Sequence, residues 1–143
     1  MASSKSYLAL VFVALAVFFL AATTSAQNSQ EGSDTRIRDL LIEKRDVLAD
    51  HLTHAESQFK MGKLESLALL NAKLRLLDAE LALADSAAER IKVLKDRLDI
   101  HRAKESRSLE LYKTGNVTFG ENIDAIVQRI DAAIALSRET GNN

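Results

Sequence analysis

The chain has 143 residues, a formal net charge of −1, no cysteine, no proline and five glycines. The absence of cysteine excludes a disulfide framework and a thiolate metal site among these residues. The near-neutral charge lacks the basic footprint that is typical of nucleic-acid-binding proteins, so no nucleic-acid partner is expected. Ala, Leu, Glu, Lys and Arg dominate the composition, which predicts an all-α fold that is held together by helix packing.

The N-terminus has the pattern of a signal peptide. Lys5 is the single charge before the apolar stretch at residues 7–22, and small residues lead to Ala26. We therefore predict a signal peptide over residues 1–26 and a flexible leader over residues 27–32. The protein is expected to be exported, to the periplasm or outside the cell, with no stable membrane insertion after cleavage. The alternative is an uncleaved signal that anchors the chain in a membrane.

The rest of the chain contains an internal repeat of 53 residues. A shift of 53 positions aligns residues 37–84 with residues 90–137 without a gap and pairs Gly62 with Gly115. Apolar and aromatic positions stay in step over this long window, which indicates a duplication. We predict one helical hairpin over residues 33–85, a second over residues 86–139, and a disordered tail over residues 140–143.

Each repeat is predicted to form a helix, a turn and a second helix. Ser33 or Asp34 can cap the first helix, and Ser86 opens the third with a capping-box pattern. The predicted helices cover about residues 33–61, 66–84, 87–113 and 118–139. Short connections make consecutive helices antiparallel, so the two tandem hairpins are expected to form an antiparallel four-helix bundle or coiled coil.

The predicted hairpin tips share one pattern, in which a glycine follows an aromatic residue by three positions. Glycine suits the left-handed backbone just past a helix end because it has no Cβ. Near the second glycine, Thr and Glu form another capping-box pattern. The predicted tip residues are Phe59, Gly62, Tyr112, Gly115, Thr118 and Glu121.

The apolar faces of the helices differ. Residues 66–84 carry two apolar seams, one of them built on Leu69, Leu76 and Leu83, so this helix is predicted to lie at the centre of the core. This seam of Leu69, Leu76 and Leu83 is the predicted surface for a protein partner or for self-association. Residues 101–108 are predicted to be solvated. The last helix has one seam, formed by Ile123, Ile126, Val127, Ile130 and Ile134.

The sequence contains no pattern that is typical of catalysis or of cofactor binding. His51 and His54 stand three residues apart, so both imidazoles can share one helix face and bind a metal ion. No third ligand is placed by the sequence. We therefore expect no enzyme and no cofactor, with exposed histidines as the plain interpretation and a metal site as the alternative.

The two tip segments resemble the coiled-coil hairpins of the TolC-type outer-membrane efflux family. The shared pattern is aromatic-x-x-Gly-x-apolar-Ser/Thr, followed by an apolar seam. In that family such a turn is the periplasmic tip of a hairpin, and two hairpins repeat within one protomer. This chain lacks the alternating strands that build the family's barrel, and its first tip has Glu65 and Ala68 where the second has Thr118 and Glu121.

Together these patterns predict a non-enzymatic, exported helical protein. Its predicted role is that of a structural or protein-interaction module of the bacterial cell envelope, related through the resemblance to efflux components. The alternative function is a periplasmic bundle that binds a metal ion or a small ligand through His51 and His54.

Overall fold

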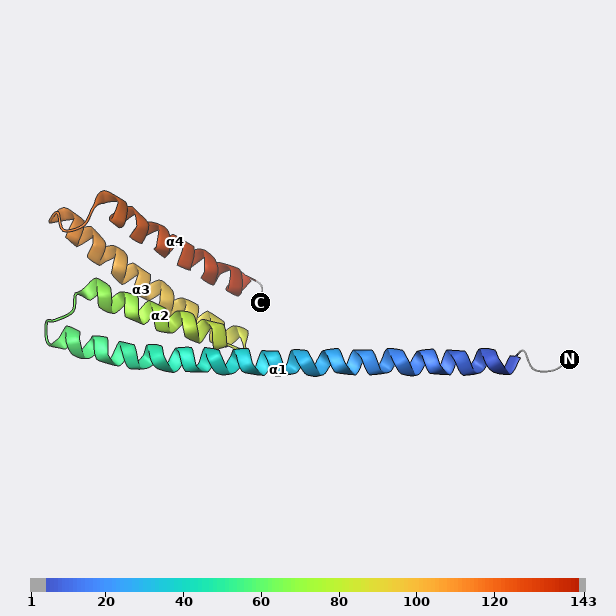
Figure 1. Ribbon diagram of the computed structural model, residues 1–143. Helices are drawn as coiled ribbons and strands as arrows, with labels where there is room; N and C mark the ends of the chain where they lie inside the picture. The colour runs from blue at the N-terminus through green and yellow to red at the C-terminus, as the bar shows by residue number, and fades with distance from the viewer. Residues whose placement is uncertain (1–4, 142–143) are drawn as a thin grey trace. The chain divides into compact units, whose positions relative to one another are not determined.

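The computed structural model describes the backbone of residues 5–141 and the side chains of residues 32–141. Over this range it contains four helices and no strand: α1 (Lys5–Lys60), α2 (Ser66–Leu83), α3 (Ala87–Lys113) and α4 (Phe119–Gly141) (Figure 1). The predicted all-α class is confirmed. The chain divides into two units, Met1–Leu40 and Leu41–Asn143, and the second contains the C-terminal part of α1 with α2, α3 and α4.

Helix ends that depend on local patterns lie close to the predicted positions. The capping box at the start of α3 is confirmed: the Glu89 amide donates to Ser86 Oγ over 3.2 Å, and the Ser86 amide donates to Glu89 Oε2 over 3.1 Å. These backbone and side-chain hydrogen bonds lower the pKa of Glu89. The first turn of α3 is therefore stabilised by its own side chains.

The start of the first helix differs from the prediction. Neither Ser33 nor Asp34 begins a helix, because α1 continues through both from Lys5. No proline interrupts this stretch, and Gly32 is not among the residues with positive φ, so nothing in the backbone breaks the helix. The signal peptide and the leader lie outside the residues whose side chains are described, and both stay predictions.

At the other end, α4 continues to Gly141, two residues beyond the predicted end. Thr140 Oγ1 donates to the carbonyl oxygens of Leu136 and Ser137, as a helical threonine does. The rest of the predicted tail, residues 142–143, lies outside the described residues.

The core of the second unit is centred on α3. This helix packs against α2 and against α4, whereas the backbones of α2 and α4 do not approach each other closely. The predicted centre, α2, also packs between two helices, but α3 carries more of the buried residues, five against three. The buried apolar residues are Leu48 and Ala55 on α1, Ala72, Leu74 and Ala79 on α2, Val93, Leu94 and Leu98 on α3, and Ala125 and Ala132 on α4.

Ion pairs connect α2 to both of its neighbours in this unit. Lys73 Nζ lies 3.7 Å from Glu56 Oε1 on α1, and Arg97 Nη2 on α3 lies 2.9 Å from Asp78 Oδ1. Figure 1 shows α2 between the C-terminal part of α1 and α3, whereas α4 flanks α3 alone. Helix α2 therefore has a helix on two sides.

Polar and charged side chains connect α3 and α4 beside the buried alanines Ala125 and Ala132. Arg90 Nε and Glu139 Oε1 are 2.7 Å apart, and Arg129 Nε and Glu105 Oε2 are 2.6 Å apart. Lys104 Nζ donates to Gln128 Oε1 over 2.9 Å. These pairs lie in the C-terminal half of α4, between Gln128 and Glu139, and fix which face of that half meets α3.

The middle of α3 is not the solvated segment that was predicted. His101 and Ser108 are buried, with 8% and 3% of their surface exposed. Lys104 and Glu105 contact α4, whereas Arg102, Ala103, Ser106 and Arg107 are exposed, so only one face of residues 101–108 is removed from water. A stretch that is polar in sequence thus contributes to the interior.

The position of the core can be tested by truncating one leucine. Leu98→Ala should lower the free energy of unfolding by about 2–5 kcal/mol, because it leaves a cavity at a side chain that is only 7% exposed. Ile130→Ala on α4, where 43% of the side chain is exposed, should cost less than about 1 kcal/mol. Urea denaturation of both variants measures the difference. Equal losses would contradict a core centred on α3.

Candidate interaction surfaces

The two hairpin turns have the same backbone geometry. Gly62 has φ 70° and Gly115 has φ 75°. In the first turn the Gly62 amide donates to Phe59 O over 2.9 Å, and in the second the Gly115 amide donates to Tyr112 O over 3.0 Å. The next amide in each turn, five residues past its acceptor, closes the Schellman motif, with Lys63 donating to Gln58 O and Asn116 donating to Leu111 O.

The two turns differ in how the next helix begins. In the second, the Glu121 amide donates to Thr118 Oγ1 over 3.2 Å, and the Thr118 amide donates to Glu121 Oε2 over 2.7 Å. These hydrogen bonds lower the pKa of Glu121. In the first, Glu65 occupies the N-cap position and makes no side-chain capping hydrogen bond. The second turn is therefore the better-stabilised one.

Aromatic side chains stand at both turns. Tyr112 and Phe119 have ring centroids 6.0 Å apart and planes tilted by 57°, so the two rings pack across the second turn. Phe59, at the first turn, has 42% of its surface exposed. Each tip thus presents apolar surface beside its glycine.

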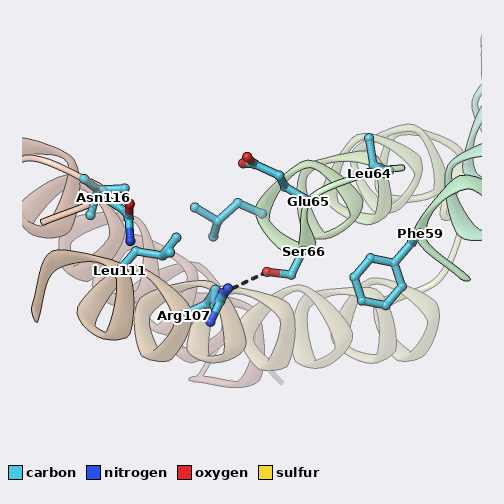
Figure 2. A pocket seen from close by; sticks show the side chains of 9 residues that line it. Phe59, Leu64, Glu65, Ser66, Arg107, Leu111 and Asn116 are labelled. Carbon is cyan, nitrogen blue, oxygen red and sulfur yellow. Dashed lines mark hydrogen bonds between the residues drawn. The ribbon is translucent and has the colours of Figure 1, made fainter. Parts of the chain in front are cut away.

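A cavity of about 700 Å³ lies between the two turns. Figure 2 shows Arg107 of α3 and Ser66 of α2 pointing toward each other across it, and Arg107 Nε donates to Ser66 Oγ over 3.0 Å. A second Arg107 nitrogen, Nη1, donates to Glu110 Oε2 over 2.9 Å. The guanidinium is therefore already held by two protein oxygens. The lining residues are Phe59, Leu64, Glu65, Ser66, Leu67, Arg107, Leu111, Asn116 and Val117.

The two histidines of the predicted metal site are both exposed on α1. His54 Nε2 lies 2.8 Å from Gln58 Nε2, so one ring nitrogen of His54 already has a protein partner. Among the described residues, no group of three or more His, Cys, Asp or Glu side chains could hold a metal ion. The structure therefore brings no third ligand to this pair in the region it describes.

Helix α4 presents its apolar seam to solvent. We define the α4 stripe as Phe119, Ile123, Val127, Ile130 and Ile134, whose exposed fractions are 63%, 38%, 47%, 43% and 42%. At 100° per residue these positions span a sector of about 80° on one side of the helix. The side that faces α3 carries small and polar residues instead, with Ala125, Ala132 and Asn122 buried. The five residues of the α4 stripe thus point away from the core, whereas Ile126 and Leu136 of the same helix are half-buried.

The seam predicted for partner contact on α2 is less accessible. Leu69, Leu76 and Leu83 are each half-buried. The predicted seam of the last helix contains four residues of the α4 stripe, and Phe119 lies outside it. Sequence reasoning missed Arg107 and Leu111 at the tip cavity, for which the sequence carries no signal, since the cavity forms only when the two turns come together.

Buried His101 is the main titratable group of the interior. Burial lowers its pKa first, and the nearby cations of Arg97 and Lys104 lower it further, while Asp78 of α2 and Asp131 of α4 act in the opposite direction. Its Nδ1 atom has no hydrogen-bond partner among the described residues. The folded protein therefore favours neutral His101.

In the part of the chain whose side chains are described, no helix has the length and apolar character needed to cross a membrane.

Comparison of the chain with protein families, with curated proteins and with solved structures finds no match.

The unequal caps of the two turns predict unequal mutational effects. Thr118→Ala should cost about 1 kcal/mol, because it removes the acceptor of the Glu121 amide. Glu65→Ala, at the equivalent position of the first repeat, should cost almost nothing. Installing the box there with Glu65→Thr and Ala68→Glu should add up to about 1 kcal/mol. Thermal unfolding of the three variants measures these differences, and a larger loss at Glu65 would contradict the assignment.

Neutral His101 predicts a pH dependence of stability. Because its pKa is lowered in the folded state, unfolding takes up a proton as the pH falls below the unfolded value of about 6.5. The contribution of neutral His101 to the free energy of unfolding is then complete above that pH. Below it, this contribution declines by at most about 1.4 kcal/mol per pH unit. Urea titrations at pH 7.5, 6.5 and 5.5 should show a shallower decline for His101→Leu than for the parent chain. His54→Gln, a change at an exposed histidine, should keep the parent's slope.

Proposed function

We propose that this chain is an exported, non-enzymatic protein-interaction module whose contact surface is the α4 stripe. The observation that carries this proposal is the orientation of α4. Its buried face is built on Ala125 and Ala132, while its largest apolar side chains face solvent. A helix that turns its large apolar residues outward has a surface suited to a partner.

The energetic argument rests on the continuity of the stripe. Isolated exposed apolar residues are common on protein surfaces and need no explanation. Five such residues in one row form a contiguous patch, and a soluble monomer rarely keeps a large patch of this kind without use. Covering it gains about 25 cal/mol for each Å² of apolar surface removed from water. The stripe is thus the largest source of binding energy on α4.

The export and envelope parts of the proposal are supported by the sequence. Lys5 and the apolar residues 7–22 support a signal peptide. The similar φ angles of Gly62 and Gly115, together with the matching hydrogen-bond patterns of their turns, support a duplicated hairpin. The tip pattern supports a relation to the hairpins of TolC-type efflux proteins, and hence a place in the cell envelope.

The stripe on α4 is a better contact surface than the α2 seam of Leu69, Leu76 and Leu83. Those leucines are half-buried, because α2 has helices on two sides. The five α4 residues have between 38% and 63% of their surface exposed. No specific observation favours metal binding by His51 and His54, because no third ligand lies beside them in the described region.

Photo-crosslinking in living cells tests this function. A benzoyl-phenylalanine at Val127, in the middle of the stripe, should give a crosslinked product of defined mass on irradiation. The matched control places the same probe at Ser106, an exposed polar position on α3, where no product is expected. A product at Val127 that contains any defined protein, including a second copy, supports an interaction module. The absence of any product at Val127 would overturn it.

A further inference from the structure

We propose that the α4 stripe binds the α4 stripe of a second copy, in an antiparallel pair related by a two-fold axis. This inference rests on the proposed function, because it names the partner of the same surface. Three observations support it. Another helix covers the equivalent surface of α2 in the first repeat. In an antiparallel register the apolar residues of the two stripes stand opposite each other, and the charged residues beside each stripe then face opposite charges on the second copy.

The first observation compares α4 with α2. A shift of 53 positions pairs Leu74 with Val127, and it also pairs Leu77 with Ile130 and Leu81 with Ile134. Leu74 is only 8% exposed, whereas Val127 is 47% exposed. Helix α2 lies between two helices, and α4 lies against α3 alone (Figure 1). The stripe on α4 is therefore the counterpart of a surface that a helix covers in the first repeat, which points to a helix as its partner.

The second observation concerns register. When Val127 of one copy stands level with Ile134 of the other, the two-fold axis passes between Ile130 and Asp131. Each Ile130 is then within one residue, or about 1.5 Å along the axis, of the level of its own counterpart. An isologous pair of this kind brings the same patch of both copies together. The apolar residues of the central part of α4 thus cover one another.

The third observation is the charged flank of the stripe. Asp124, Asp131 and Arg138 recur every seven residues and are all exposed. At 100° per residue they fall within about 40° on the same side of the stripe. In the antiparallel register Arg138 of each copy lies within one residue of the level of Asp124 of the other, so two attractive pairs form. The two Asp131 side chains meet near the axis and weaken the contact.

The charges of α4 do not favour an anionic membrane surface as the partner. Interfacial helices of that kind carry Lys and Arg on the polar face. The acidic side chains of α4 are Glu121, Asp124, Asp131 and Glu139, and its basic side chains are Arg129 and Arg138. The basic Arg129 is already paired with Glu105 of α3. An acidic helix with one apolar row is better suited to a second helix.

The pairing needs no rearrangement of the hairpin. The contacts to α3, such as Arg90 with Glu139 and Lys104 with Gln128, lie away from the stripe and stay in place. The second copy covers only side chains that already face solvent. The two α3–α4 hairpins can therefore associate as rigid bodies.

The absence of cysteine makes site-specific crosslinking a direct test in the full-length chain. Ile130→Cys should form a disulfide-linked dimer under mild oxidation, at least fivefold more than Ser106→Cys on α3. Val127→Cys mixed with Ile134→Cys should crosslink more than either variant alone, because the antiparallel register pairs these two positions. A parallel pair would reverse that order and overturn the register.

The charge pattern supplies a second test in the Ile130→Cys background. Asp124→Arg and Arg138→Asp each place like charges across the axis, so each should lower the dimer yield several-fold. The double variant exchanges the charges and should restore the dimer yield. Binding to a different partner would not be restored by this exchange. Asp131→Asn should raise the yield. Circular dichroism checks that all variants keep the parent's helicity.

The outcomes separate this inference from the proposed function. Crosslinking at Ile130 with rescue by the charge exchange supports the second copy. No self-crosslink at Ile130 above the Ser106 control overturns it. If the photo-crosslinking probe at Val127 then captures a different protein, the interaction module stands without self-association. If that probe captures nothing, both proposals fall.

Discussion

The polar contact between α3 and α4 determines which face of α4 is exposed to solvent. Pairs such as Arg90 with Glu139 and Glu105 with Arg129 fix the rotation of α4 about its own axis. Exposed ion pairs contribute little to stability one at a time, but three polar contacts along one helix select a single face. The small side chains of Ala125 and Ala132 let the two helices approach. With that face committed to α3, the five residues of the α4 stripe point outward.

The parts of the fold that depend on neighbouring residues could be predicted from the sequence. Gly62 and Gly115 stand where the backbone is left-handed, a conformation in which any other residue is strained. Ser86 caps α3 by accepting a hydrogen bond from the amide of Glu89, three residues later. The helix ends followed from these signals. The start of the first helix did not, because a serine or an aspartate caps a helix only where the chain actually turns, and α1 continues straight through Ser33 and Asp34.

The faces of the helices could not be predicted in the same way. An apolar seam shows that a helix has an apolar face to bury. The seam alone does not show whether the element that packs on this face belongs to the same chain. Ile123 and Ile130 belong to the predicted seam of the last helix, and both are exposed. Conversely, His101 and Ser108 lie in a stretch that is polar in sequence, and α4 buries them. The tip cavity is lined by residues of both turns, so no local sequence pattern predicts it.

The orientation of α4 also links its stability to its partner. Its buried apolar side chains are alanines, which remove little surface from water, so the inward face supplies only a modest part of the free energy that holds the helix. The cap at Thr118 and the polar pairs with α3 add to it. Any protein that covers the α4 stripe binds the folded hairpin and not the unfolded chain, and it therefore stabilises α4 by mass action. Under the proposed self-association, the stability of the last helix rises with the concentration of the protein itself, which couples assembly to the folding of α4.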